Sequence, residues 1–276
     1  MRYWTNGNQP FQTLHQTIMN KIEDSAAYRA RKQFFDGLLT IYGRKPVLEA
    51  LEQPGVKIHR LHLADSNKPA GILDQIEGIA RDQNAEVLHH SRQALSRISK
   101  NAKQDQGVAA DLRLQQYQTL DDFLANQPAQ FELLAVDGIT NPQNLGMILR
   151  SVAASGIAGV LLPSQGCAQI DPLVIKASAG ALFRCPIIRC EKLVDALRTL
   201  QQTGSRIGTL SSHAQHTLGE LPPQSKCVFV LGNETHGVSE QVQQLSDFGV
   251  RIPMHNGVES LNVAITASLI AFRHAL

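Results

Sequence analysis

Polar residues interrupt the chain just before its apolar C-terminal end. Glu259, Ser260 and Asn262 precede "VAITASLIAFRHAL", a segment that we expect to form a buried helix. A Ser side chain accepts hydrogen bonds from the free N–H groups of a first helical turn, so we expect Ser260 to cap this helix. An Asn inside a helix that enters a core needs partners for its donors and acceptors. The position of Asn262 therefore indicates that its side chain forms hydrogen bonds with a partner outside the core.

Two other polar loops carry residues that suit ligand binding. In "NPQNLGMILR" we expect Asn144 to cap a helix, on which Arg150 follows among apolar neighbours. Arg150 either extends its head into water or presents its guanidinium fork to a phosphate. In "LGNETHG", Glu234 follows Gly232 at the end of an apolar run, as a solvated turn residue or as a ligand.

Several common functions are disfavoured. The chain has no GxGxxG after its first strand and no P-loop, and "HAQH" lacks the Glu and the third ligand of a metalloprotease motif. Its four cysteines show no CxxC pair and no zinc-ligand spacing, so we expect free thiols and no metal. No apolar run approaches the roughly 18 residues of a membrane span, and the N-terminus lacks a secretory h-region. We therefore expect a cytoplasmic protein that makes no membrane contact.

Positive charge is concentrated in the first part of the chain. Through residue 115 there are 16 Lys and Arg against 12 Asp and Glu, a net +4; the remainder has 10 against 12, a net −2. The stretch "SRQALSRISKNAKQ" contains no acid, and if it is helical, three of its cations share one side. It is either a solvated face or a patch that contacts phosphates, as in nucleic-acid binding. Its cations are Arg92, Arg97, Lys100 and Lys103.

The elements expected around these residues divide the chain into four parts. Residues 1–37 are polar and predict a helix from about Phe11 to Phe35. Residues 38–115 alternate strand and helix patterns, with strands at "KIHRLHLA", "AEVLHH" and "GVAADLRL", which indicates a small α/β module. Residues 116–131 are polar, contain a short helix closed by Pro128, and are interpreted as a linker.

Residues 132–276 predict a larger α/β domain. Six near-continuous apolar runs alternate with longer helical segments, and strands without polar alternation are buried on both faces in a parallel sheet. Ligands bind at the carboxyl ends of such strands. The loops "ITNPQNLG", "NETHGVSE" and "HNGVESLN" follow three of these strands, so we expect the chemistry there.

Three blocks in order, "NPQNLGMILRSVAASGI", "VLGNETHGVS" and "IPMHNGVESLNVAITASL", resemble the three motifs of the SpoU/TrmH family of RNA ribose 2′-O-methyltransferases. Their order, internal spacings and strand-end positions match over roughly residues 132–276. Upstream, "IYGRKPVLEAL" and "QGVAA" resemble the small L30e/L7Ae-like RNA-binding module that often precedes this domain. Residues 1–37 lie outside the resemblance.

The resemblance implies a sheet whose C-terminal segment passes through a loop to form a trefoil knot, S-adenosylmethionine as cofactor, no metal, and a homodimer with each site near the subunit interface. The implied catalytic residues are Asn144, Arg150, Glu234, Ser260 and Asn262. The implied cofactor contacts are Leu231, Gly232, Ile252, Met254 and Leu261, largely through main chain. The predicted RNA contacts are Arg44, in the block that resembles the RNA-binding module, and the cations of the acid-free stretch, Arg92, Arg97, Lys100 and Lys103.

The resemblance implies that substrate and cofactor, and not the core, form hydrogen bonds with the polar groups of Ser260 and Asn262. The implied chemistry is attack by a ribose 2′-hydroxyl, which must lose its proton as it attacks. In the mechanism proposed for the family, the residue at the position of Arg150 accepts this proton. A free Arg, however, stays protonated at ordinary pH. We therefore expect Arg150 to position the hydroxyl and the adjacent phosphate. His236 and Ala264 depart from the residues frequent in the family, and neither carries an expected role.

The expected function is thus methylation of a ribose 2′-hydroxyl in structured RNA. The N-terminal module favours ribosomal RNA over transfer RNA, because this arrangement is commoner among family members that act on ribosomal RNA. An alternative from another class is a non-catalytic RNA-binding protein that retains the knotted fold. A third possibility, methylation of a base nitrogen, belongs to a relative of the fold and is disfavoured by the Ser-Leu-Asn motif.

Overall fold

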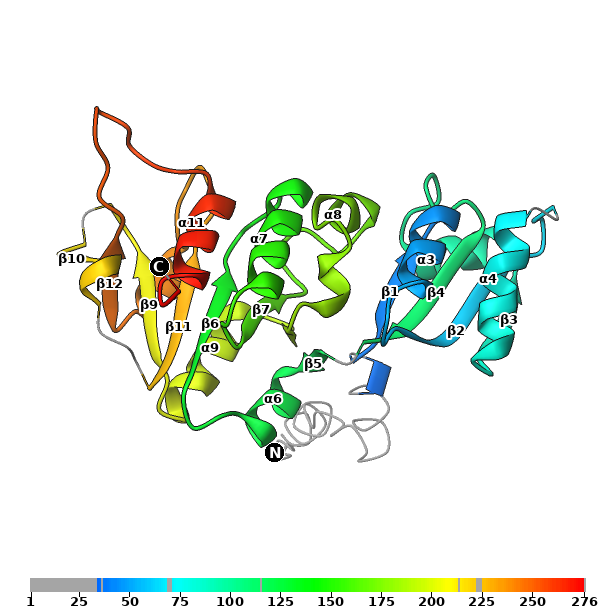
Figure 1. The fold of residues 1–276 in the computed structure, drawn as a ribbon, viewed down its shortest axis with the longest axis horizontal. Coiled ribbons are helices and arrows are strands. Elements are labelled where there is room, and N and C mark those ends of the chain that lie inside the picture. Colours follow the sequence, from blue (N-terminus) through cyan, green and yellow to red (C-terminus); the bar gives the residue numbers. More distant parts are fainter. Residues whose placement is uncertain are drawn as a thin grey trace, which may run out of the picture. The chain divides into compact units, whose positions relative to one another are not determined.

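Two units make up the chain, residues Met1–Phe35 and Asp36–Leu276. In the first unit the expected helix from Phe11 lies outside the described residues, apart from Phe34 and Phe35, which are helical. The second unit contains both sheets of the described residues (Figure 1). The computed structural model describes residues 34–35, 37–68, 71–114, 116–212, 214–221 and 225–275.

The small α/β module is confirmed as a four-stranded sheet in the order β1-β4-β2-β3. β4 pairs antiparallel with β1 and β2, and β2 pairs parallel with β3. Strand β1 is absent from the three strands predicted for this module; its four residues become a strand through pairing with β4. The elements are β1 (Leu39–Tyr42), α3 (Arg44–Leu51), β2 (Lys57–Ala64), α4 (Gly71–Asp82), β3 (Glu86–His90), α5 (Arg92–Ser99) and β4 (Val108–Arg113).

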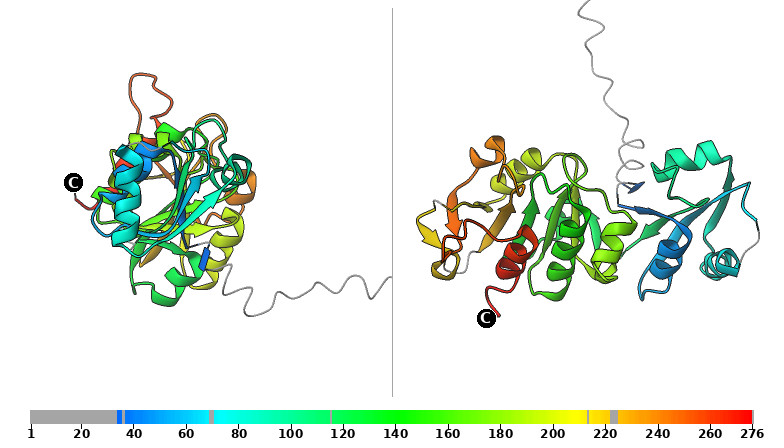
Figure 2. Two further views of the ribbon diagram at one scale, coloured as in Figure 1. Left: turned by 90° about the vertical axis from the view of Figure 1, so that its right-hand side faces the viewer. Right: turned by 90° about the horizontal axis from the view of Figure 1, so that it is seen from above.

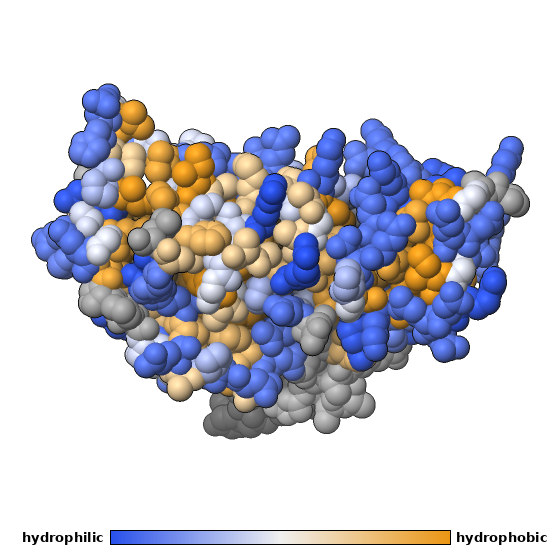
Figure 3. Space-filling model, viewed as in Figure 1, coloured by the Kyte–Doolittle hydropathy of each residue, from blue (hydrophilic) through white to orange (hydrophobic). Residues whose placement is uncertain are grey.

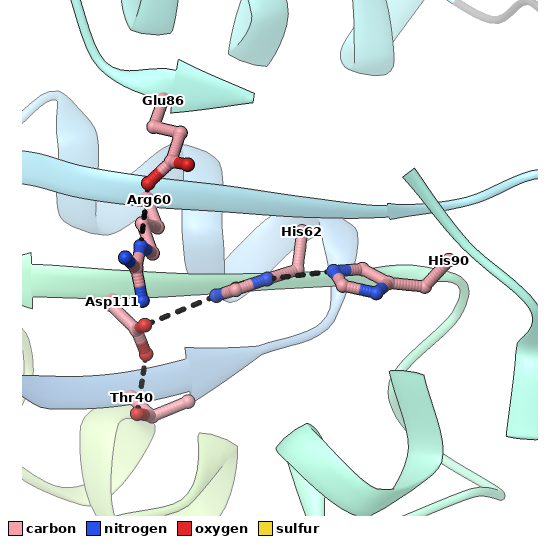
Figure 4. A network of polar contacts seen from close by, with 6 residues as sticks. All are labelled: Thr40, Arg60, His62, Glu86, His90 and Asp111. Atoms are coloured by element: carbon pink, nitrogen blue, oxygen red, sulfur yellow. Dashed lines mark hydrogen bonds and ion pairs between the residues drawn. The ribbon is translucent and has the colours of Figure 1, made fainter. Parts of the chain in front are cut away.

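Side-chain alternation separates the two faces of this small sheet. Ala110 and Leu61 belong to the core cluster that also contains residues of α3 and α4, whereas Ala109 and Tyr42 pack with Leu95 of α5. The face that carries α5 also bears a row of polar contacts that crosses all four strands (Figure 4). We call this row the four-strand stripe; its members are Thr40, Asp111, His62 and His90.

The large domain contains the predicted parallel sheet, with eight strands in the order β10-β12-β9-β11-β6-β7-β8-β5. All seven strand pairs are parallel. Its elements are β5 (Tyr117–Thr119), α6 (Leu120–Asn126), β6 (Phe131–Val136), α7 (Pro142–Ala154), β7 (Gly159–Pro163), α8 (Pro172–Ala177), η1 (Ala181–Arg184), β8 (Ile187–Cys190), α9 (Leu193–Gln202), β9 (Arg206–Leu210), β10 (His216–Thr217), η2 (Leu218–Glu220), β11 (Lys226–Leu231), α10 (Glu240–Gln243), β12 (Phe248–Arg251) and α11 (Val263–Ala271).

Helices cover both faces of this sheet, which explains why its strands are apolar without alternation. Leu134 of β6 faces the core that includes residues of α7, α8 and α11, while its neighbour Leu133 faces the core that includes residues of α9 and α10. Figure 2 shows α7 and α11 on one side of the sheet and α9 and α10 on the other. Within the described residues, no helix is both long and apolar enough to cross a membrane.

Two expectations for this domain need correction. The segment 116–131 is not a free linker, because β5 pairs with β8 and α6 packs Phe123 against Phe131, with ring centroids 5.1 Å apart. One of the longer helical segments expected between the apolar runs, "PLVIKASAGALF", is not one helix: it breaks into α8 and η1 at Ala179 and Gly180, whose φ angles are +50° and +76°. An α-helix cannot continue through backbone of that hand.

Candidate active site

The three expected ligand loops emerge at one edge of the large sheet. They follow β6, β11 and β12, whose carboxyl ends point the same way because all three strands are parallel. The loops comprise residues 137–141, 232–239 and 252–262. Crevices outside the carboxyl ends of parallel strands are the usual ligand sites of such sheets, so these loops remain the predicted place for a ligand.

Helix α7 is capped by Asn141, and the expectation that Asn144 caps it was wrong. The Asn141 Oδ1 accepts hydrogen bonds from the N–H groups of Gln143, at 2.8 Å, and Asn144, at 3.3 Å. Pro142 then occupies the first helical position, where its missing N–H costs nothing. Because Asn141 does the capping, the buried side chain of Asn144 is available for contacts outside its own helix.

Helix α11 is capped by Asn262, and the expectation that Ser260 caps it was also wrong. The helix begins at Val263, and the Asn262 Oδ1 accepts a hydrogen bond from the Ala264 N–H at 2.8 Å. Asn262 is therefore exposed at the helix end and does not enter the core. Ser260 lies exposed two residues earlier, and within the described part of the chain it forms no hydrogen bond.

Three side chains join in one row of hydrogen bonds, which we call the amide chain: Glu234 from the loop after β11, Asn144 from the first turn of α7, and Asn262 from the end of the loop after β12. The Asn262 Nδ2 donates to the Asn144 Oδ1 at 3.1 Å, and the Asn144 Nδ2 donates to the Glu234 Oε1. These residues are 118 and 90 positions apart in sequence. The fold thus brings together three of the five residues expected to be catalytic.

All the hydrogen bonds of the amide chain point in the same direction. The Ala264 N–H donates to Asn262, Asn262 to Asn144, and Asn144 to the carboxylate of Glu234. Successive hydrogen bonds of one direction polarise one another, and the last one is strengthened by the acceptor's negative charge. Each amide therefore has a fixed orientation, with one N–H left over for a ligand.

Burial differs along the amide chain. Asn144 in its middle is only 7% exposed, while Glu234 and Asn262 at its ends are open to solvent. A ligand entering this edge of the sheet can therefore reach both ends without displacing the central residue. Such an arrangement suits binding and orientation of a polar substrate, because the groups that meet it are already held in place.

Arg150 does not belong to the amide chain. It lies six residues after Asn144 on α7, which is about 9 Å along the helix axis. Its side chain is exposed, and none of the described residues forms a hydrogen bond or ion pair with it. Arg150 and the 40%-exposed Met147 are three residues apart and so share the outer face of α7.

The residues expected at the cofactor lie around the loops after β11 and β12. Leu231 is buried, and Ile252, Met254 and Leu261 are half-buried apolar side chains. Only glycine fits at position 232, because an added Cβ would lie 2.1 Å from the Gly237 carbonyl carbon.

The expected cationic surface is less regular than predicted. Arg92 and Arg97 are exposed on α5, but this helix ends at Ser99 and Lys100 adopts a left-handed φ of 54°. Lys103 therefore lies beyond the helix, and the expectation that three cations share one helical side was wrong. Arg44 is tied down: its Nε donates to the Gln106 carbonyl at 3.1 Å.

Two residues of the site were missed from the sequence. Asn233 bonds across to the Gly138 carbonyl at 2.8 Å, joining the loop after β11 to the loop after β6. The Asp137 carboxylate accepts from the Ser239 N–H at 2.7 Å and makes a second such tie. Asn and Asp next to glycines at strand ends were the available signal, since their side chains commonly bond to nearby backbone in turns.

Known families match both halves of this architecture. Residues 132–272, more than half of the chain, match the SpoU rRNA Methylase family, and residues 40–118 match the family described as RNA 2'-O ribose methyltransferase substrate binding. The chain belongs to the SpoU rRNA methylase family. The amide chain and its three loops therefore lie in a SpoU domain, and the small sheet corresponds to the substrate-binding module.

Individual relatives agree with this assignment. The chain is 34% identical over 235 residues to the 23S rRNA (guanosine-2'-O-)-methyltransferase RlmB of Xylella fastidiosa, covering 84% of this chain and 94% of that protein. It is 32% identical over 237 residues to a putative TrmH family tRNA/rRNA methyltransferase of Staphylococcus saprophyticus, covering 85% and 94%. The fold is similar to the SpoU methyltransferase AviRb of Streptomyces viridochromogenes in complex with AdoMet, with a TM-score of 0.60, 22% identity, and coverage of 90% and 92%.

Proposed function

We propose that this protein transfers a methyl group from S-adenosylmethionine to the ribose 2′-hydroxyl of a nucleotide in structured RNA, and in ribosomal rather than transfer RNA. The observation that carries the proposal is the amide chain. Glu234, Asn144 and Asn262 come from three separate blocks of sequence and meet at the ligand edge of the sheet. A protein that had lost catalysis would have no need to keep these three side chains in one oriented row.

The chemistry of the loop residues fits S-adenosylmethionine. The backbone N–H groups of Met254 and Leu261 have no hydrogen-bond partner within the described residues. They lie in the loop that follows β12, next to apolar side chains, and such a combination suits the flat adenine ring with its acceptor nitrogens. Leu231, Gly232, Ile252, Met254 and Leu261 would hold the cofactor, which supplies a methyl group made electrophilic by its sulfonium sulfur.

The residues of the chain then orient the nucleophile. When bound, the cofactor would supply its methyl group to the ribose O2′, and the hydroxyl proton would leave to a base or to water. Ser260 and the free N–H of Asn262 can hold the ribose, and Arg150 can hold the adjacent phosphate with its guanidinium fork. Fixing the hydroxyl at the correct distance and angle is itself a large part of such a rate enhancement.

Ribosomal RNA is favoured by the relatives and by the small module. The Xylella fastidiosa relative is described as acting on 23S rRNA, and the match spans nearly all of that protein. The expected RNA-contacting residues Arg92, Arg97, Lys100 and Lys103 are all exposed on the module or its loops. Cations of this kind strengthen binding to any RNA phosphate and do not choose the sequence.

A homodimer is also part of the proposal. Apolar residues lie exposed on α7, on α11 and in the loop before α11, and Figure 3 shows apolar surface over α11 and that loop. Large apolar side chains that share an exposed face indicate a protein interface. Arg150 lies on this same face of α7, so a second copy packed here would bring Arg150 to the interface. The exposed side chains are Met147 at 40%, Ile265 at 52% and Val258 at 53%.

Methyl transfer from radiolabelled S-adenosylmethionine to purified ribosomal RNA and to bulk transfer RNA tests the proposal. The wild type is compared with Asn144→Ala and with Asn126→Ala, a matched control at the exposed end of α6. We expect label in ribosomal RNA with wild type and control, none with Asn144→Ala, and resistance to alkaline cleavage at the modified nucleotide.

Other outcomes contradict specific parts of the proposal. Label only in transfer RNA overturns the substrate class, and label at a nucleotide that alkali still cleaves overturns the ribose as target. Cofactor binding without transfer to assembled ribosomal subunits or to either RNA pool favours the non-catalytic RNA-binding alternative. Absence of cofactor binding overturns the central statement.

A further inference from the structure

Asn233 holds the turn that carries Glu234. Its Oδ1 accepts hydrogen bonds from the N–H groups of Thr235, at 2.8 Å, and His236, at 3.3 Å. The backbone closes the same turn, because Asn233 and Gly237 exchange two hydrogen bonds of 2.8 Å. The turn therefore has a definite shape that depends on one side chain and one pair of backbone groups.

The other half of the same amide reaches a different loop. The Asn233 Nδ2 donates to the Gly138 carbonyl at 2.8 Å, which ties the loop after β11 to the loop after β6. Gly138 has a φ of +70°, and a Cβ added there would already touch the Cβ of Asn233 at 3.4 Å. The two loops are thus in close contact at this point, and the contact is three residues from Asn141, the cap of α7.

We propose that Asn233 is a positioning residue for methyl transfer, which holds Glu234 where it can orient Asn144. The inference rests on the proposed function and names a residue that acts through Glu234 without touching the substrate. Glu234 is exposed and bonds to Asn144 across loops that are 90 residues apart. An exposed turn has few apolar contacts to fix it, so the tether to Gly138, together with the Asp137–Ser239 hydrogen bond, aligns the two loops.

Substitutions can separate the two halves of the Asn233 amide. Asn233→Asp keeps an oxygen that accepts from Thr235 and His236 but removes the donor and faces the Gly138 carbonyl with a charge. Asn233→Ala removes both halves. If the tether is what matters, both variants lower kcat by about 10-fold while KM for S-adenosylmethionine changes by less than about 3-fold. The melting temperature stays within about 2 °C, and Asn126→Ala serves as the control.

Coupling to Glu234 distinguishes positioning from a general structural effect. With Glu234→Ala lowering kcat by about 100-fold, the double variant Asn233→Asp/Glu234→Ala is expected to be no slower than Glu234→Ala alone, because residues that act as a unit are not additive. Multiplied losses of about 1,000-fold would instead mean that Asn233 acts independently of Glu234, which contradicts the proposal. A kcat for Asn233→Asp within 2-fold of wild type would overturn it as well.

A readout without activity keeps this inference separate from the proposed function. The side-chain amide of Asn144 gives an NMR signal that Asn144→Ala identifies. In Asn233→Asp this signal is expected to move toward its position in Glu234→Ala, because the carboxylate contact is lost in both. If the wild type methylates no RNA, the proposed function fails, but movement of this signal still supports the positioning role. An unmoved signal overturns that role whatever the activity.

Discussion

Two rows of polar side chains cross this molecule, and they are built in opposite ways. The four-strand stripe runs over the small sheet: Thr40 donates to Asp111 at 2.6 Å, and His62 contacts Asp111 at 3.1 Å and His90 at 3.0 Å (Figure 4). The amide chain joins three loops at the edge of the large sheet. The two central residues of the stripe are buried and its end residues are half-buried, whereas both ends of the amide chain are open to solvent.

The two rows of side chains also differ in the burial of their residues. In the stripe, His62 is 5% and Asp111 9% exposed, and both ring nitrogens of His62 and both carboxylate oxygens of Asp111 have partners within the protein. In the amide chain only the central Asn144 is buried. A satisfied buried network stabilises and specifies a fold, because an unpaired member costs free energy. A row whose end residues are exposed can form further hydrogen bonds with a ligand, as a binding site requires.

Electrostatics in the stripe agree with a structural role. Burial raises the pKa of Asp111, but hydrogen bonds from His62 and Thr40 outweigh it and hold this pKa below its usual value. Burial lowers the pKa of His90, and the neighbouring His62 lowers it further. The folded module therefore favours an ionised Asp111 and a neutral His90.

The largest expected effect is on stability in the stripe. Asp111→Ala removes the partner of the half-buried Thr40 hydroxyl and of the buried His62 Nε2, and should cost the small module about 3 kcal/mol. Hydrogen exchange of the β2 and β4 amides measures this loss, with Asp121→Ala on the exposed side of α6 as the control. The kcat of the folded fraction should not change; a large drop in kcat without faster exchange would show that the stripe takes part in catalysis.

The next effect is on rate at the amide chain. Glu234→Ala should lower kcat by about 100-fold, the size of effect seen when one oriented group is removed from an active site. Glu234 is itself exposed, but its loss leaves the Nδ2 of the buried Asn144 without its acceptor, so the free energy of unfolding should fall by about 1 kcal/mol. Single-turnover methyl transfer together with thermal unfolding checks both numbers. Strong destabilisation with normal turnover would reverse the roles assigned to the two rows.

A smaller effect separates capping from orientation at Asn262. Asn262→Ser keeps a side-chain oxygen for the helix N-terminus, so stability should fall by only a few tenths of a kcal/mol, whereas Asn262→Ala should cost about 1 kcal/mol. Both variants lose the donor to Asn144 and should lower kcat by a similar factor. If Asn262→Ser recovered full turnover, the cap alone would explain this residue, and the amide chain would end at Asn144.

The smallest effect is the pH dependence of the stripe. The folded pKa of His90 lies below its unfolded value, so its contribution to stability is present above about pH 6.5 and is lost as the pH falls below that. Asp111, also depressed, adds a loss below about pH 4. Exchange of β4 amides from pH 7.5 to 5, corrected for intrinsic rates, should show the first loss, and His90→Gln should remove it. Greater protection of the wild type at pH 5 than at pH 7 would contradict this sign.

Much of the fold followed from pattern. Apolar runs without alternation predicted the parallel sheet of the large domain, and "KIHRLHLA" predicted β2 at its observed ends. Errors arose where local signals depend on pairing: four residues became β1 only because β4 lies beside them. Helix starts were misplaced because both Ser260 and Asn262, and both Asn141 and Asn144, are residue types that cap helices. Only backbone geometry chose between them.

The sequence by itself determined the residue types, their order and the family, since three motifs with fixed spacing rarely occur together by chance. The tertiary structure decided which of those residues meet. Glu234, Asn144 and Asn262 touch because parallel strands bring their loops to one edge, and Arg150 stays apart because six residues of helix turn it to another face. Contacts across about a hundred residues depend on how strands pair, and no local pattern contains that information.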